Sequence, residues 1–223
     1  MGITIGIDLG TTNSAMCIKK MSVSPILNAE GEELTPSCVT AVPHPDNVSF
    51  DLIVGRASRD LLKQYPEQTI MSVKRLMGRD FEDPEVQSLI KDHHVSYEII
   101  TDASEPGSIR ILFAGKMQIP EIISGIILSK LTRDGEKELE GTIDQAVVTV
   151  PAYFSDRQKF ATRAACDYAG IKLLRLLPEP TAAALSFGLG ELGKHESRTI
   201  MVFDLGGGTF DISILSFSGG SFM

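Results

Sequence analysis

A short pattern that could bind phosphate occurs near both ends of the chain. Each copy consists of an apolar run, the tripeptide Asp-Leu-Gly and a turn of small residues with a threonine, at residues 5–12 and 201–209. Glycine lets a backbone come close to a phosphate, and successive amides in a tight turn form a concavity that binds anions. One copy is compatible with an ordinary capped hairpin. Two copies indicate two lobes that offer phosphate-binding turns to one shared ligand.

The two aspartates of the pattern, Asp8 and Asp204, indicate a cation beside that phosphate. A carboxylate repels a bare phosphate, so both residues make sense when a hard cation lies between them. Mg²⁺ is typically held by a few carboxylates together with phosphate oxygens and water. The pattern therefore predicts a site for Mg²⁺ and a nucleoside polyphosphate. A Walker-A segment is absent, and residues 206–208 do not match the glycine pattern of dinucleotide-binding folds.

Charge and composition restrict the class of protein further. The 223 residues carry a formal net charge of −8, which argues against a nucleic-acid partner because neutralising phosphates takes a basic face. No stretch approaches the roughly 18 to 20 apolar residues of a membrane helix. Three cysteines without paired spacing favour reduced thiols over a disulfide framework. These features predict a soluble, cytoplasmic protein without a membrane partner.

The segments that must position the two turns follow an α/β pattern. A strand is expected before each turn and a second strand after it, at residues 15–20 and 210–215. Isoleucines after Pro120 recur at helical spacing, and the continuous apolar run at 146–150 is typical of a central strand buried on both faces. Ser155 followed by Gln158 predicts a capping box at the start of the next helix. A further, alanine-rich helix is expected at 182–187.

Four ordered segments resemble the seventy-kilodalton heat-shock chaperones, the DnaK family within the actin-like ATPase superfamily. They lie at residues 6–14, 150–154, 179–184 and 203–211, and residues 72–79 match a further family segment. The shorter spacing between the segments and the proline at position 178 resemble those of a bacterial paralogue of the HscC type. The resemblance implies an α/β, actin-like ATPase (ribonuclease H-like) fold, with lobe I nearly complete and only the first hairpin of lobe II present.

The expected domain boundaries combine this resemblance with the breaks in the sequence. Proline at positions 43 and 45 ends the first β pattern, and a small α+β subdomain is expected at 43–119. The core subdomain of lobe I is then formed by residues 1–42 and 120–190. Lobe II begins at residues 198–223, after a polar linker at 193–198.

The resemblance also implies roles for individual residues. The catalytic residues are Lys74, Glu179, Asp204 and Thr209. The β- and γ-phosphates are held by Gly10, Thr11, Thr12, Asn13, Gly206, Gly207, Gly208 and Thr209. The metal residues are Asp8, Glu179 and Asp204, which hold Mg²⁺ largely through water, and Asp211, which lies near K⁺. Signalling between domains is assigned to Pro151, Lys159 and Arg175.

Some of these assignments keep an alternative or depart from the family pattern. Either Glu179 or Asp204 could orient the attacking water, and the sequence does not choose between them. Lys74 belongs to a Lys-Arg pair, which without the family context indicates a solvated surface. Lys159 stands where the family usually has arginine, which puts the transmission of signals in doubt because the two side chains differ in hydrogen-bonding geometry.

The function that the resemblance implies is binding and hydrolysis of ATP, with ADP as product, to regulate peptide binding in a domain that is absent here. Partners of the intact protein would be unfolded client peptides, a J-domain co-chaperone and an exchange factor. We expect this chain, as a fragment or a truncated gene product, to hydrolyse ATP weakly or not at all. A sugar or acetate kinase of the same superfamily is one alternative. A non-catalytic fragment that associates with another chain through an exposed strand edge is the other.

Overall fold

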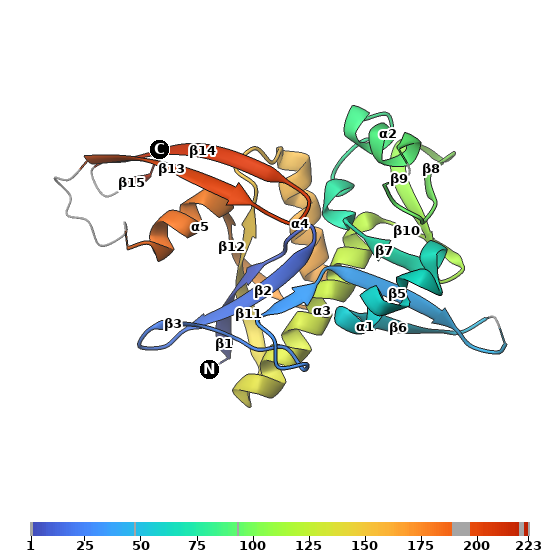
Figure 1. Cartoon of the computed structure of the whole chain (residues 1–223), viewed down its shortest axis with the longest axis horizontal. Helices are drawn as coiled ribbons and strands as arrows, with labels where there is room; N and C mark the ends of the chain where they lie inside the picture. Colours follow the sequence, from blue (N-terminus) through green and yellow to red (C-terminus); the bar gives the residue numbers. More distant parts are fainter. Residues whose placement is uncertain (1, 47, 93, 189–196, 219–220, 223) are drawn as a thin grey trace.

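A mixed sheet of six strands forms the centre of the molecule in the computed structural model, which describes residues 2–46, 48–92, 94–188, 197–218 and 221–222. The strands run in the order β12-β11-β1-β2-β3, with β4 also paired to β2 (Figure 1). Their bounds are β1 Ile3–Asp8, β2 Asn13–Lys19, β3 Val23–Pro25, β4 Leu34–Pro36, β11 Ile143–Val150 and β12 Lys172–Pro178. Strands β1, β11 and β12 are parallel, whereas β2 is antiparallel to β1. The strands expected around the first Asp-Leu-Gly turn are confirmed.

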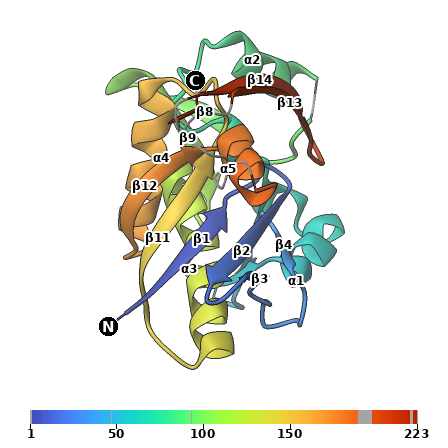
Figure 2. The same cartoon turned by 90° about the vertical axis from the view of Figure 1, so that its left-hand side faces the viewer.

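Three helices cover the two faces of this sheet. Helices α3 (Pro120–Leu139) and α4 (Asp156–Tyr168) pack against each other, and the third helix is α5 (Glu179–Ser186). Figure 2 shows α5 in front of the sheet and α3 behind it. Crossovers between parallel strands are nearly always right-handed, which brings α3 and α4 to the same face. The predicted capping box is present, since the Ser155 and Gln158 side chains each accept a hydrogen bond from the other residue's backbone.

Strand β11 differs from its expected burial. Ala146, Val148 and Val150 are buried beneath α3 and α4, but Val147 and Thr149 on the other face are only half-buried. The expectation that this strand is buried on both faces is therefore wrong. The physical reason is the length of the covering helices, because α3 has 20 residues and α5 has only 8.

Two small antiparallel sheets lie beside α3, on the right of Figure 1. One consists of β5 Cys38–Pro43, β6 Phe50–Val54 and β7 Thr69–Met71, with α1 Arg56–Asp60 against it. The other consists of β8 Ile99–Asp102, β9 Glu105–Phe113 and β10 Lys116–Gln118, and α2 Pro84–Lys91 precedes it in the chain. One continuous cluster of buried apolar side chains links both regions to the central sheet, from Ile5 to Phe113 and Ile171. The boundaries of the small subdomain therefore stay a prediction.

The second Asp-Leu-Gly turn joins two strands of a long hairpin. Its strands are β13 Ser197–Leu205 and β14 Phe210–Ser218, and β15 Ser221–Phe222 pairs with β14. This hairpin was expected from the sequence and is confirmed. Helix α5 contacts both β13 and β14. The linker expected at 193–198 lies mostly outside the described residues.

Candidate functional site

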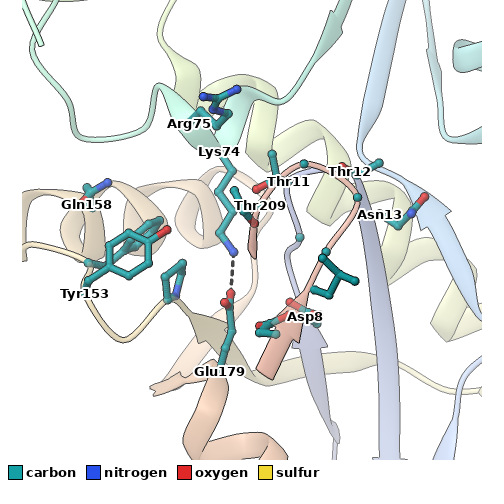
Figure 3. Close-up of a pocket in the computed structure, with 18 of the residues that line it drawn as sticks. Asp8, Thr11, Thr12, Asn13, Lys74, Arg75, Tyr153, Gln158, Glu179 and Thr209 are labelled. Carbon is teal, nitrogen blue, oxygen red and sulfur yellow. Dashed lines mark hydrogen bonds and ion pairs between the residues drawn. The ribbon is translucent and has the colours of Figure 1, made fainter. Parts of the chain in front are cut away.

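Both Asp-Leu-Gly turns line one cavity of about 260 Å³ (Figure 3). The first turn (residues 8–13) connects β1 to β2, and the second turn (residues 204–209) connects β13 to β14. The two turns approach each other closely, because a Cβ atom placed on Gly207 would lie 2.8 Å from the Thr12 side chain. Pockets for whole small-molecule ligands usually measure about 300 to 1,000 Å³. The cavity is slightly smaller than this range, and the turns that line it are suited to phosphate groups.

The first turn is held tightly by its surroundings. The hydroxyl of Thr149, on β11, donates a 3.0 Å hydrogen bond to the Asp8 carboxylate. At Gly10 the backbone leaves no room for a side chain, since a Cβ atom would lie 2.0 Å from the carbonyl oxygen of Asn13. The glycine of this Asp-Leu-Gly copy is thus required by the hairpin itself.

Lys74 enters the cavity from a short 3₁₀ turn, Val73–Arg75, between the two small sheets. Its ammonium nitrogen lies 2.7 Å from Oε1 of Glu179, the first residue of α5, and 5.7 Å from the centre of the Phe154 ring. Only 9% of the Lys74 side chain and 16% of the Glu179 side chain are exposed. The interpretation of Lys74 as a solvated surface residue is therefore wrong, because an acid 105 residues away in the chain compensates its burial.

The carboxylates around Lys74 repel one another. Burial raises the pKa of Glu179, and Asp8 and Asp204 raise it further, whereas Lys74 opposes the shift. Burial and Asp204 also raise the pKa of Asp211, which lies opposite Asp204 across the hairpin. A cation at this end of the cavity would stabilise the ionised carboxylates. Among the described residues, no three His, Cys, Asp or Glu side chains are arranged to hold a metal ion directly.

Not all the predicted site residues line the cavity. Its walls include Pro151 and the predicted phosphate residues of both turns, but not Asp211, Lys159 or Arg175. Lys159 lies on α4, where its ammonium nitrogen is 3.8 Å from Asp156, and Arg175 is exposed on β12. The structure therefore brings together the residues predicted for catalysis and phosphate binding and leaves two of the three residues predicted for signalling outside.

Seven residues of the cavity wall were not singled out as site residues from the sequence: Arg75, Arg79, Glu85, Tyr153, Phe154, Gln158 and Leu205. Gln158 is buried, and its Nε2 atom has no hydrogen-bond partner while its Oε1 completes the capping box. Arg79 forms ion pairs with Asp83 and Glu85 at the wall. Tyr153 is 59% exposed, and burial together with nearby carboxylates raises its pKa. The capping box did identify Gln158 as structured, but nothing in the pattern indicated that its amide also reaches the cavity.

The fold and the cavity together define a class of protein. A mixed α/β lobe whose first hairpin faces a second Asp-Leu-Gly hairpin across a small polar cavity has the organisation of the actin-like ATPases. Residues 4–223 match the family model described as Hsp70 protein, so the chain belongs to the Hsp70 family. Helices long and apolar enough to span a membrane do not occur in the described part of the chain.

Two relatives illustrate this membership. The chain is 42% identical over 225 residues to heat shock 70 kDa protein 2 of Paracoccidioides lutzii. It is 44% identical over 223 residues to chaperone protein DnaK of Thermus thermophilus. Both alignments cover 100% of this chain but only 33% and 34% of the relatives. The chain thus spans about a third of the length of the curated relatives that it matches.

Proposed function

We propose that this chain is the ATP-binding and ATP-hydrolysing region of a molecular chaperone. The observation that carries the proposal is that both Asp-Leu-Gly turns and the Lys74–Glu179 pair line one cavity. The names of the relatives support a chaperone. In the whole protein, ATP would regulate the binding of unfolded client peptides, with a J-domain co-chaperone and an exchange factor as further partners.

The two turns would hold the β- and γ-phosphates of the nucleotide. Backbone amides and hydroxyl groups of such turns are suited to phosphate oxygens. The residues proposed for this role are Gly10, Thr11, Thr12, Asn13, Gly206, Gly207, Gly208 and Thr209, all of which line the cavity.

Carboxylates at one end of the cavity would hold Mg²⁺ largely through water. The proposed residues are Asp8, Glu179 and Asp204, with Asp211 near K⁺. The raised pKa values of Glu179 and Asp211 support a cation there, because a bound positive charge favours the ionised carboxylates. When bound, Mg²⁺ would neutralise charge on the phosphate oxygens.

Lys74 would stabilise the phosphoryl group as it is transferred to water. Phosphoryl transfer gains mainly from positioning and electrostatics, so a buried ammonium group at the cavity is well suited to the role. Its ion pair with Glu179 holds the Lys74 side chain in the cavity. Glu179 or Asp204 would orient the attacking water, and Thr209 would contact the γ-phosphate. Pro151, Lys159 and Arg175 would transmit the state of the site to the peptide-binding region.

Calorimetry with Mg-ATP and Mg-ADP tests the site. Lys74→Ala is expected to weaken Mg-ATP binding and to lower any hydrolysis by about 100-fold. Lys130→Ala is a matched control, since Lys130 is also mostly buried and ion-paired, with Glu30 and Asp134, outside the cavity. Absence of nucleotide binding at millimolar concentration, or equal effects of the two substitutions, would contradict the proposal.

Two further measurements separate this function from its alternatives. Membership of the Hsp70 family favours a chaperone over a sugar or acetate kinase. A kinase would transfer phosphate to a sugar or acetate, whereas the proposed ATPase releases it to water, and a phosphate-release assay distinguishes them. Light scattering tests for association with another chain, and a monomer would count against the non-catalytic alternative.

A further inference from the structure

A buried serine outside the predicted site contacts the first turn at two points. Ser37 lies between β4 and β5 and is 3% exposed. Its hydroxyl donates a 2.7 Å hydrogen bond to the carbonyl oxygen of Gly10, and its backbone N–H donates a 2.9 Å bond to the carbonyl oxygen of Thr12. One residue therefore holds the carbonyl groups on both sides of Thr11.

The direction of the hydrogen bonds around Ser37 follows from the number of protons. A carbonyl oxygen only accepts, so the single hydroxyl proton of Ser37 is used by Gly10. The 2.9 Å contact between the Ser14 and Ser37 hydroxyls must then be donated by Ser14. Ser14 is fully buried at 0% exposure. The result is a directed relay from Ser14 through Ser37 to the backbone of the turn, in which each bond polarises the next.

This relay determines where the amide donors of the turn point. A peptide group is planar and trans, so its N–H is directed opposite to its C=O. The Gly10 carbonyl shares a peptide group with the Thr11 N–H, and the Thr12 carbonyl shares one with the Asn13 N–H. Because Ser37 holds both carbonyls, both N–H groups are directed away from Ser37. Thr11 and Asn13 line the cavity, whereas Ser37 does not.

We propose that Ser37 is a positioning residue for nucleotide binding, which orients the Thr11 amide of the first turn through its bond to Gly10. Ser37 itself lies outside the cavity wall and acts through the backbone. The inference rests on the proposed function, because the oriented amide would donate a hydrogen bond to a phosphate oxygen. Its geometric part, the order of the Gly10–Thr11 peptide, is independent of any ligand.

The test compares Ser37→Ala with Ser58→Ala. Ser58 is an equally buried serine at 0% exposure, and its hydroxyl bonds with Thr40 at 2.8 Å and with the Cys38 sulfur at 3.1 Å. Both substitutions remove a buried hydroxyl from a small network, so similar losses of stability are expected. Of these two serines, only Ser37 has a hydrogen bond to the first turn. The measurements are Mg-ADP affinity by calorimetry, the free energy of unfolding, and the NMR order parameter of the Thr11 N–H.

Ser37→Ala is expected to weaken Mg-ADP binding about tenfold, because the free energy lost with one buried hydrogen bond corresponds to a change in affinity of about this size. The NMR order parameter of the Thr11 N–H is expected to fall more than that of the Asn13 N–H, since the backbone bond from Ser37 to Thr12 remains. Ser58→Ala is expected to leave both readouts at their unsubstituted values. Unchanged affinity in Ser37→Ala, or an equal loss in Ser58→Ala, would overturn the inference.

Failure of the proposed function gives a different result. If the unsubstituted chain does not bind Mg-ADP, the nucleotide site is refuted and the role of Ser37 in binding falls with it. The order parameter of the Thr11 N–H then still decides the geometric part. A lower order parameter in Ser37→Ala than in Ser58→Ala supports the orienting bond, and equal values refute it.

Discussion

The two Asp-Leu-Gly turns share a sequence but differ in what surrounds them. In the first copy, Ile7 and Leu9 are 1% and 3% exposed, whereas the matching Phe203 and Leu205 of the second copy are 63% and 79% exposed. The aspartates differ in the same way. Asp8 accepts a hydrogen bond from Thr149, but Asp204 faces the like charge of Asp211 across the hairpin.

The difference shows that one motif can be held in place by two different means. The first turn is part of the central sheet and depends on the packing of its neighbours. The second turn is closed by its own 2.9 Å bond from the Gly206 N–H to the Thr209 carbonyl, and α5 contacts the two strands that it joins. Regions with few buried apolar contacts open at lower free energy than core strands. The first turn should therefore be the stable half of the cavity and the second turn the adjustable half.

The largest difference in stability between the two turns is expected when a methyl group is added to the first glycine of each turn. Gly10→Ala brings a Cβ atom to 2.0 Å from the Asn13 carbonyl oxygen, whereas the Cβ of Gly206→Ala lies 3.5 Å from the Thr209 carbonyl oxygen. Because a backbone atom cannot move aside cheaply, Gly10→Ala should lower the free energy of unfolding by about 3 kcal/mol or more. Gly206→Ala should change it by less than about 1 kcal/mol. Chemical denaturation measures both, and equal losses would contradict the distinction.

Truncating the leucine of each motif tests the difference in burial. Leu9→Ala should destabilise the fold by about 3 kcal/mol, because it removes a buried side chain and leaves a cavity. Leu205→Ala removes an exposed side chain and should change the free energy of unfolding by about 0.5 kcal/mol or less. Thermal unfolding of the two variants provides the measurement. A large loss in Leu205→Ala would show that its surface is covered in solution.

The smallest effect expected concerns the charge of the second turn. Burial and Asp204 raise the pKa of Asp211. The protonated Asp211 side chain therefore contributes its full stabilisation when the pH is below the ordinary carboxyl pKa of about 3.9. This contribution is lost as the pH rises through the raised pKa. Asp211→Asn avoids the loss and should therefore gain about 0.5 kcal/mol relative to the unsubstituted chain between pH 3.5 and pH 7.

Urea denaturation at the two pH values measures this gain. In an Asp204→Asn background the gain should shrink, because the neighbouring like charge is gone. The same advantage for Asp211→Asn at both pH values, or in both backgrounds, would contradict an electrostatic origin.

Local rules predicted most of the fold. The capping box at Ser155, the helix after Pro120 and the strands around both turns each depend on a few adjacent residues, and the structure contains all of them. The actin-like fold followed from the resemblance of four ordered segments and is confirmed by the family match. The burial of β11 was predicted wrongly because it depends on how far α5 reaches over the sheet, which no local pattern encodes.

The candidate site was less accessible to the same reasoning. The turns carry their chemistry in their own sequence, but Lys74 becomes a cavity residue only through Glu179 and Phe154. By pattern alone, a Lys-Arg pair indicates solvent exposure. Ser37 gave no chemical signal at all, since its role depends on a bond to a backbone carbonyl 27 residues earlier. Roles that arise from long-range contacts require the structure.

The parallel pairing of β1 with β11 also sets the order in which the molecule can be assembled. The bond between Thr149 and Asp8 joins residues 141 positions apart, so the first turn reaches its final environment only after that length of chain exists. At about 5 to 20 residues per second, synthesis of the intervening segment takes roughly 7 to 30 seconds. During this interval the N-terminal strand is an unpaired apolar edge on one side. The first turn, which we expect to be the stable half of the cavity, is thus completed only long after its own residues have been made, although still before the second turn exists.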